Sequence, residues 1–209
     1  MKIQTKQELK FAIQADMMMN RGKFQWTLKD RIKHVFAPDY IMQFLRTMRK
    51  TAYYQSQKSS PFILLLRGYW SIKYRKLGLK LGFSIGSDTL GYGVVIPHYG
   101  TIVVGGSNQI GNFAVLHTST CITANGKVIG DGLYLSTGAK ITSKLVLGNN
   151  ISVGANSVVN KEFEENNIMI GGTPAKKIKD TLAWYERDGE SFRIKVQKVN
   201  ELKNKYQLH

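Results

Sequence analysis

The sequence has a single cysteine, Cys121, in 209 residues, so no disulfide can form within the chain. Acidic residues are scarce, with 14 Asp and Glu against 30 Lys and Arg. The longest apolar run, residues 62–66, is too short to span a bilayer. Residues 1–20 lack the continuous apolar segment that a signal peptide contains. These absences argue against a disulfide-stapled secreted domain. We expect a cytoplasmic protein, with the inner membrane surface as a further location.

The positive charge is concentrated at the beginning of the chain. Residues 1–80 contain 17 Lys and Arg against 4 Asp and Glu, whereas residues 81–178 contain 6 against 5. This concentration of positive charge favours anionic partners, meaning nucleic acid, phospholipid headgroups or a polyanionic substrate. A helical surface exposed to solvent explains the excess of lysine and arginine equally well. Because no nucleic-acid-binding motif is present, we expect no nucleic-acid partner.

The N-terminal third has the pattern of helices. Thr5 and Glu8 have the spacing of a capping box that opens a first helix. Pro38 starts or interrupts a second helix, and Pro61 precedes a third segment over residues 62–80. This last segment mixes aromatic residues with lysines and arginines. It could lie on a membrane surface, but we favour packing against a neighbouring helix or subunit.

The middle of the chain contains a six-residue repeat. Aliphatic residues recur at every sixth position in three blocks: Leu90, Ile96 and Ile102; Ile110, Leu116 and Ile122; and Ile129, Leu135, Ile141, Leu147, Val153 and Val159. A period of six fits neither an α-helix nor an alternating strand. It fits a three-sided solenoid in which six residues make one short strand and one corner, and three such units make one coil.

The repeat predicts a mainly β fold built around a left-handed parallel β-helix. We expect an N-terminal helical region over residues 1–80, the β-helix over residues 81–178 and a C-terminal helical tail over residues 179–209. The extra residues between the three blocks contain Gly105-Gly106 and Asn125-Gly126, which are turn-forming dipeptides. The tail is predicted to cover the open end of the solenoid, where strand edges would otherwise be unpaired.

The same period predicts a column of residues at one corner of the solenoid. His98, Thr118, Thr137 and Ala155 each follow an aliphatic repeat position by two residues, and His117 lies beside this column. Strands of neighbouring coils lie about 4.8 Å apart, so about 14 Å separates the first residue of the column from the last.

The stretch 82–179 resembles the hexapeptide-repeat acyltransferases, and within them the serine acetyltransferase-like and polysaccharide O-acetyltransferase branch. Five segments carry the resemblance together: PHYGTIVV (97–104), IGDG (129–132), TGAKI (137–141), VGANSVV (153–159) and GGTPAK (171–176). Each segment by itself is a weak signal, but the set is specific.

This resemblance implies acetyl-CoA as the acetyl donor and a homotrimer with active sites between subunits. Two trimers could join into a hexamer through the N-terminal helices. The length of the column suits an extended pantetheine arm, with the thioester near His98 and the nucleotide near the later coils. The predicted cofactor-binding residues are Thr137, Gly138, Gly154, Ala155, Lys161, Pro174, Lys176 and Lys177.

The resemblance also places His98 in the position of the catalytic histidine. A hydroxyl attacks a thioester poorly unless a base takes its proton, and an unperturbed histidine, with a pKa of about 6.5, suits that task. Backbone N–H groups at a glycine-rich corner could stabilise the resulting oxyanion. We predict His98 as the general base. His117 is a second catalytic candidate that would bond the acceptor or the thioester, and a structural corner residue is the alternative.

The acceptor is predicted from what is missing. Serine acetyltransferases have a carboxylate about one coil before the histidine, but residues 83–85 contain no acid, and Pro97 stands where those enzymes have an Asp. Their Asp-Arg-His loop has no counterpart around residues 125–127. We therefore expect a hydroxyl of a sugar or polysaccharide precursor, or of another small molecule. Serine O-acetylation and a non-catalytic trimeric scaffold are the alternatives.

A zinc enzyme similar to γ-type carbonic anhydrases is the other enzyme class that a β-helix suggests. Such a site needs three histidines, and of His34, His98, His117 and His209 only two lie within the repeats. We expect no metal. Cys121 is interpreted as a small packing residue and not as a nucleophile.

Overall fold

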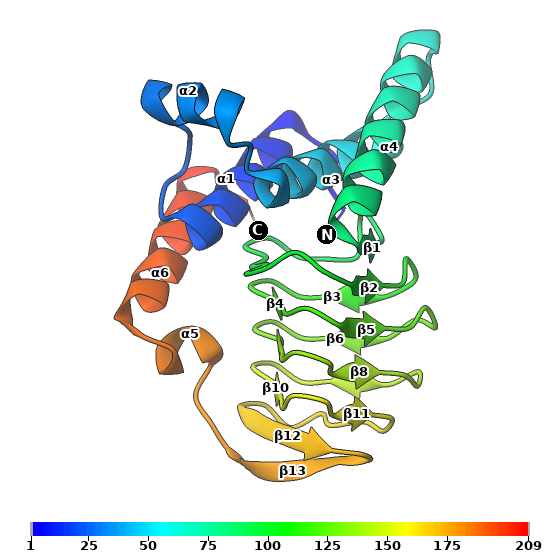
Figure 1. Ribbon diagram of the computed structural model, residues 1–209, viewed down its shortest axis with the longest axis vertical. Coiled ribbons are helices and arrows are strands. Elements are labelled where there is room, and N and C mark those ends of the chain that lie inside the picture. Colours follow the sequence, from blue (N-terminus) through cyan, green and yellow to red (C-terminus); the bar gives the residue numbers. More distant parts are fainter. Residues whose placement is uncertain (1, 209) are drawn as a thin grey trace.

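The computed structural model describes residues 2–208. It is a column of short parallel strands, with a layer of helices across one end and a hairpin at the other end (Figure 1). The predicted mainly β fold, a parallel β-helix with helices before and after it, is confirmed. No helix between residues 2 and 208 is long and apolar enough to cross a membrane.

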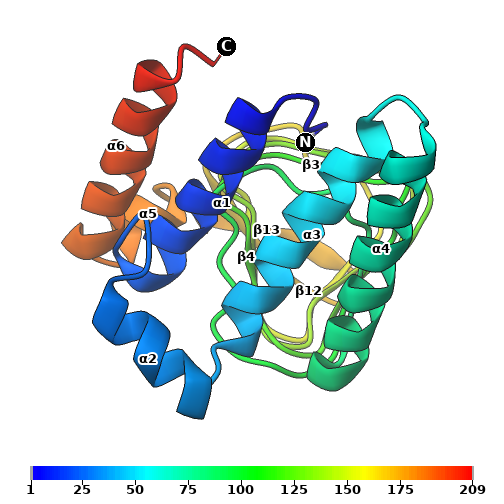
Figure 2. The same ribbon diagram turned by 90° about the horizontal axis from the view of Figure 1, so that it is seen from above.

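Four helices form the layer at the N-terminal end of the column, as seen from above in Figure 2. They are α1 (Lys6–Arg21), α2 (Leu28–Phe36), α3 (Tyr40–Ser56) and α4 (Pro61–Leu81). The predicted capping box opens α1, and Pro61 is the first residue of α4, where its missing N–H costs no hydrogen bond. Helix α2 was not predicted from the sequence, because its nine residues bury no side chain and so give no core pattern.

The strands form the three sides of the prism. One side holds β1 (Phe83–Ile85), β2 (Ile102–Val104), β5 (Thr120–Ile122), β8 (Lys140–Ile141) and β11 (Val158–Val159). The second holds β4 (Val115–Leu116), β7 (Tyr134–Leu135), β10 (Ser152–Val153), β12 (Ile168–Gly172) and β13 (Ala175–Asp180), and the third holds β3 (Gln109–Ile110), β6 (Val128–Ile129) and β9 (Val146–Leu147).

The repeat positions form the interior of the prism. All twelve aliphatic residues of the three blocks are at most 4 % exposed. Neighbouring coils pair in parallel and in register, as in Leu116 with Leu135 and Leu135 with Val153. Each coil thereby satisfies the backbone groups of the next, so that aliphatic burial and the hydrogen-bond ladder stabilise the same arrangement.

A buried ion pair joins the helical layer to the first coil. Arg49 on α3 and Asp16 on α1 are 0 % and 1 % exposed, and the Arg49 Nε to Asp16 Oδ2 distance is 2.8 Å. The Arg49 guanidinium also donates to the carbonyl oxygens of Leu90 and Gly91, at 2.8 and 2.5 Å, and Asp16 accepts from the N–H of Val94 at 3.0 Å. The pair therefore bonds backbone groups of the first coil and ties the helical layer to it.

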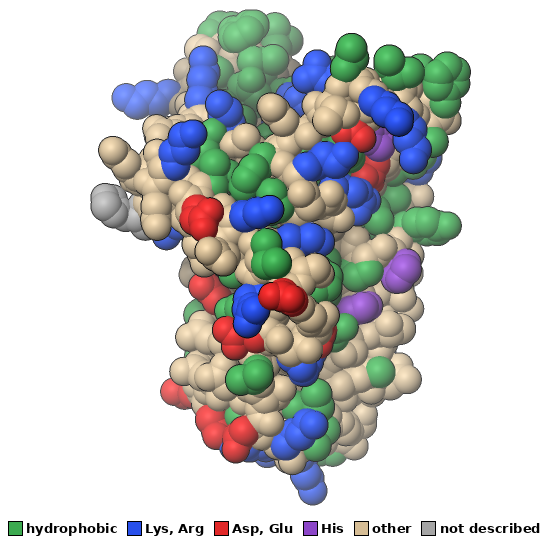
Figure 3. All heavy atoms as spheres, turned by 90° about the vertical axis from the view of Figure 1, so that its left-hand side faces the viewer, with side chains coloured by type: hydrophobic (Ala, Val, Ile, Leu, Met, Phe, Trp, Pro, Cys, Tyr) green, Lys and Arg blue, Asp and Glu red, His purple; other side chains and the backbone are tan. Residues whose placement is uncertain are grey.

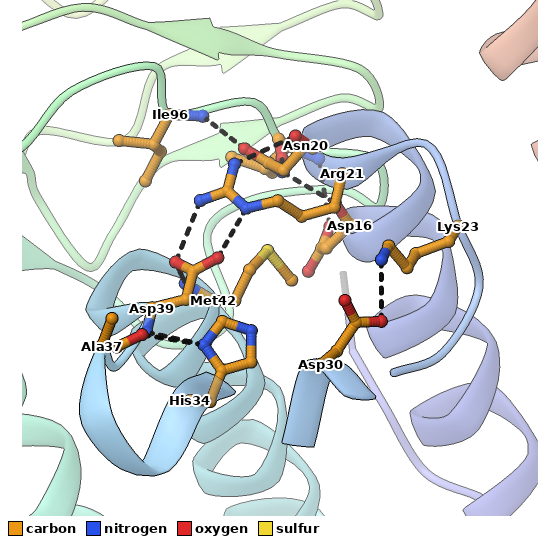
Figure 4. A network of polar contacts seen from close by, with 11 residues as sticks. Asp16, Asn20, Arg21, Lys23, Asp30, His34, Ala37, Asp39, Met42 and Ile96 are labelled. Atoms are coloured by element: carbon orange, nitrogen blue, oxygen red, sulfur yellow. Dashed lines mark hydrogen bonds and ion pairs between the residues drawn. The ribbon is translucent and has the colours of Figure 1, made fainter. Parts of the chain in front are cut away.

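The end of α1 makes a second contact with the solenoid, shown in Figure 4. The Asn20 side chain donates to the carbonyl oxygen of Val94 at 2.6 Å and accepts from the N–H of Ile96 at 3.2 Å. Next to it, Arg21 pairs with Asp39 at 2.5 Å, which ties the end of α1 to the start of α3. Helix α1, more than 70 residues earlier in the sequence, thus holds the backbone immediately before His98.

The C-terminal tail takes a different course from the predicted one. After β13 the chain runs back along the outside of the column to α5 (Trp184–Arg187) and α6 (Glu190–Lys205), which lies beside α1 (Figure 1). Trp184 is 2 % exposed, and its Nε1 donates to the carbonyl oxygen of Phe113 at 2.8 Å. The expectation that the tail covers the open end of the solenoid is wrong, because β13 folds back antiparallel on β12 and closes that end.

Candidate active site

The predicted column exists at one corner of the β-helix. The strand register aligns Leu116, Leu135 and Val153, so the residues two positions later, Thr118, Thr137 and Ala155, follow one another down this edge. Backbone bonds continue along the column, from the N–H of Gly138 to the carbonyl of Thr118 at 3.1 Å, and from the N–H of Asn156 to that of Thr137 at 3.0 Å.

His98 stands at the head of this column, on a loop that is held on both sides. Before it, Asn20 bonds the N–H of Ile96. After it, Gly100 donates its N–H to the carbonyl of Leu81 at 3.0 Å. Gly100 has a φ of 135°, and a Cβ there would lie 3.2 Å from Thr118 Cγ2, so a glycine is required for this approach. The loop is fixed while the His98 imidazole is exposed.

His117 lies one coil further along the column and is half-buried. Its Nε2 is 3.0 Å from the hydroxyl oxygen of Tyr134, on the neighbouring strand β7. The Tyr134 ring contacts the tail: the Arg187 Cζ lies 5.2 Å and the Trp184 ring 6.2 Å from its centroid. Arg187 in turn pairs with Asp188 at 2.6 Å. The tail therefore fixes the orientation of His117 through Tyr134.

The surroundings of His117 favour its neutral form. Burial lowers the pKa of His117, His98 lowers it further, and Asp188 opposes both effects. Figure 3 shows two histidine side chains close together on the side of the column, below the helical layer. The site thus presents an exposed imidazole beside a second one that favours its neutral form, which can hydrogen-bond a neutral hydroxyl.

We expect an NMR pH titration to show the His117 imidazole with a pKa below its ordinary value. Replacing His98 with glutamine should raise that pKa, because one of the two causes of the depression is removed, while burial remains. A His117 that titrates at or above the ordinary histidine value would contradict this account of the site.

Most of the predicted cofactor residues lie along the column. Thr137, Gly138, Gly154 and Ala155 share its edge, and Gly138 has a φ of 75°. A Cβ on Gly138 would lie 2.0 Å from Asn156 Oδ1, so the absence of a side chain there is a steric requirement. The result is a run of small residues that leaves backbone groups within reach of a ligand.

Pro174 and Lys176 follow at the far end of the same edge. Pro174 lies in the turn between β12 and β13, where the Thr173 hydroxyl donates to the carbonyl of Asn156 at 3.4 Å. Lys176 is exposed and pairs through its backbone with Gly171. These residues extend the column beyond Ala155, where the predicted nucleotide end would lie.

The other two predicted lysines are placed differently. Lys177 forms an ion pair with Asp180 at 2.8 Å and another with Glu165, and these carboxylates raise its pKa. Lys161 lies at the next corner, with its Nζ 5.3 Å from the ring of Phe163, which pairs with the third sheet. Lys161 is therefore not aligned with the column of its own chain.

Tyr134 and Arg187 were not predicted from the sequence. Tyr134 precedes a repeat position, where an outward aromatic has no obvious function, and Arg187 reaches the site only because the tail folds back. Among residues 2–208, no group of three or more His, Cys, Asp or Glu could hold a metal ion, and His209 lies outside the described residues.

Comparison with known proteins confirms the resemblance to serine acetyltransferases. No family model matches the chain. Over 98 residues it is 24 % identical to the serine acetyltransferase of Helicobacter pylori. The matched region covers 44 % of this chain and 57 % of that protein. Over 89 residues it is 25 % identical to the serine acetyltransferase of Synechococcus elongatus, covering 39 % and 36 %. The matches thus span about a third to just over half of the relatives' length.

Solved structures of serine acetyltransferases share the fold. The enzyme of Neisseria gonorrhoeae superposes with a TM-score of 0.62 at 16 % identity, covering 88 % of this chain and 71 % of that one. The soybean enzyme complexed with serine gives 0.60 at 20 % identity, covering 81 % and 69 %. A serine acetyltransferase in complex with CoA gives 0.54 at 20 % identity, covering 81 % and 68 %. The similarity extends beyond the repeats into the helical part of the chain.

Proposed function

We propose that this protein is an acetyl-CoA-dependent O-acetyltransferase and that His98 is its general base. The observation that carries the proposal is the column itself, in which an exposed imidazole heads an edge of small residues that reaches Ala155 about three coils away. Neighbouring coils at about 4.8 Å give the edge the length of an extended pantetheine arm. The CoA complex of a structural neighbour with the same fold supports acetyl-CoA as the donor.

The proposed reaction is direct transfer. His98 takes the proton of the acceptor hydroxyl while the hydroxyl oxygen bonds to the carbonyl carbon of the thioester. The tetrahedral intermediate then collapses, the carbon–sulfur bond breaks, and the departing thiolate receives the proton from His98. The neutral His117, held by Tyr134, would hydrogen-bond the acceptor and fix its angle of attack.

Serine is the acceptor that the similarities favour. Both sequence relatives are serine acetyltransferases, and one structural neighbour is a serine complex. The glycan acceptor expected from the missing acidic residues has no support among these proteins.

The proposed assembly is a homotrimer that completes the site. His98 is exposed, and the neighbouring Tyr99 is 75 % exposed, so one chain alone does not exclude water from the reacting groups. A second subunit beside the column would cover them and supply the other wall of the CoA groove. Lys161, at the next corner, would face the column of a neighbour in such an arrangement.

The test is release of free CoA from acetyl-CoA with serine, glucose or N-acetylglucosamine as acceptor at equal concentrations. We expect serine to give the largest acceptor-dependent rate above hydrolysis. A rate that rises only with the sugars would contradict serine as the acceptor but would still support the proposed acetyltransferase activity. No acceptor-dependent release, together with no binding of CoA by calorimetry, would contradict the enzyme proposal and favour the trimeric scaffold.

A further inference from the structure

The outward face of α4 carries a largely exposed apolar stripe. One side of this helix packs on α3, with Leu77 and Leu81 buried. The opposite side presents large apolar side chains that are each more than half exposed: Phe62, Leu65, Tyr69, Ile72 and Leu79. Their spacing of three, four and seven residues keeps them on one face over nearly the whole helix.

A second stripe lies on α2. Leu28, Ile32, Val35 and Phe36 are each more than half exposed, and they too recur at helical spacing. Figure 1 places α2 and the first turns of α4 at the same end of the molecule, opposite the β12–β13 hairpin. In Figure 3, hydrophobic side chains gather at this end, with lysines and arginines around them. The molecule therefore has one amphipathic end.

The charge around the α4 stripe has one sign, whereas α2 carries Asp30 beside its lysines and Arg31. Residues 40–87, which include α3 and α4, contain nine Lys and Arg and no Asp or Glu. Only Arg49 among them is fully buried, with Asp16 as its partner. The positive charges are close enough to disfavour each other: burial lowers the pKa of Lys50, and Arg46 and Lys73 lower it further. An anionic surface would relieve this repulsion.

We propose that the exposed faces of α2 and α4 dock on an anionic phospholipid membrane surface. The apolar stripes would enter the headgroup region, while the surrounding lysines and arginines would pair with lipid phosphates. A groove of about 530 Å³ beside α4 has the same combination of groups. It is lined by the apolar side chains of Tyr69, Ile72 and Leu77 together with Lys73, Lys76 and Lys80.

Two other occupants fit these observations less well. A second copy that packs α4 against α4 would bring two helices without any acidic residue face to face, and their like charges would repel. A nucleic acid would satisfy the charges, but it would leave the leucine, isoleucine and phenylalanine side chains of both stripes in water. Lipid satisfies the apolar and the cationic groups together.

The experiment is co-sedimentation of the full-length protein with vesicles. We expect binding to vesicles of equal parts phosphatidylglycerol and phosphatidylcholine, little binding to phosphatidylcholine alone, and weaker binding as salt is raised. The double variant Leu65→Asn/Ile72→Asn should lose about tenfold in vesicle affinity, because two side chains stop entering the bilayer. Ile194→Asn, an exposed apolar position on α6, is the matched control and should bind like the wild type.

A second variant keeps the test valid if the double variant does not fold. Lys73→Gln/Lys76→Gln changes two exposed positions, and it should weaken binding to the anionic vesicles, whereas Lys198→Gln/Lys205→Gln on α6 should not. Equal binding to both kinds of vesicle, or binding to neither, would overturn the proposal. So would a Leu65→Asn/Ile72→Asn variant that binds vesicles normally but sediments as a smaller oligomer, since the stripe would then be a contact between copies.

Discussion

Replacing His98 with alanine is expected to lower kcat for acetyl transfer by between about 100-fold and 10,000-fold, the range that general-base catalysis contributes. The reason is that the serine hydroxyl keeps its proton at neutral pH unless a base takes it during attack. KM for acetyl-CoA should change little, since the proposed contacts with the pantetheine arm come from the backbone and small side chains from Thr137 to Ala155. Steady-state kinetics with serine as acceptor measures both constants.

The matched control is His34→Ala. His34 lies on α2, where its Nδ1 bonds the local backbone at Ala37 and Asp39 and its ring contacts Trp26. This variant should keep wild-type turnover. If His98→Ala also keeps wild-type turnover while its circular dichroism spectrum is unchanged, His98 is not the base.

Replacing Arg49 with methionine is expected to cost about 3–5 kcal/mol of unfolding free energy, the usual effect of removing one partner from a buried ion pair. The variant leaves the Asp16 carboxylate buried without its cation and removes the donors of two first-coil carbonyl oxygens. The pair lies where the helical layer meets the first coil, so the loss of stability falls on this contact. Urea unfolding monitored by circular dichroism measures it.

Arg46→Met, on the same helix α3 but at an exposed position, is the control for helix propensity and for loss of one positive charge. It should change the unfolding free energy by no more than about 0.5 kcal/mol. If Arg49→Met lowered the unfolding free energy by no more than Arg46→Met does, the Asp16–Arg49 pair would not be what joins the helical layer to the first coil. A retained stability with weakened serine turnover would instead indicate a role in the site.

The β-helix could be predicted from the sequence because each repeat position has the same environment. An aliphatic residue at every sixth position has only the interior of the prism to fill, and Leu90 through Val159 all do so. The same six-residue period also predicted which residues line the corner column below His98, because it places the residues two positions after successive repeat positions one above the other. No side-chain contact had to be known. The start of a helix could also be predicted where one local interaction determines it, as the capping box of Thr5 and Glu8 does for α1.

The tail and its contribution to the site could not be predicted in this way. Residues 181–208 have no repeat, and their direction is decided by where Trp184 finds a buried position against Phe113. The contact from Arg187 to Tyr134 depends on that docking. The amphipathic helix α2 was missed for a related reason, because its apolar residues contribute nothing to the core from which the pattern was read.

The most direct test of the account is a crystal structure of the protein with CoA bound. The account predicts the pantetheine arm along the edge formed by Thr118, Thr137 and Ala155, with the thiol sulfur next to the His98 imidazole and the nucleotide near Pro174 and Lys176. CoA bound along another corner, or with its thiol far from His98, would contradict it.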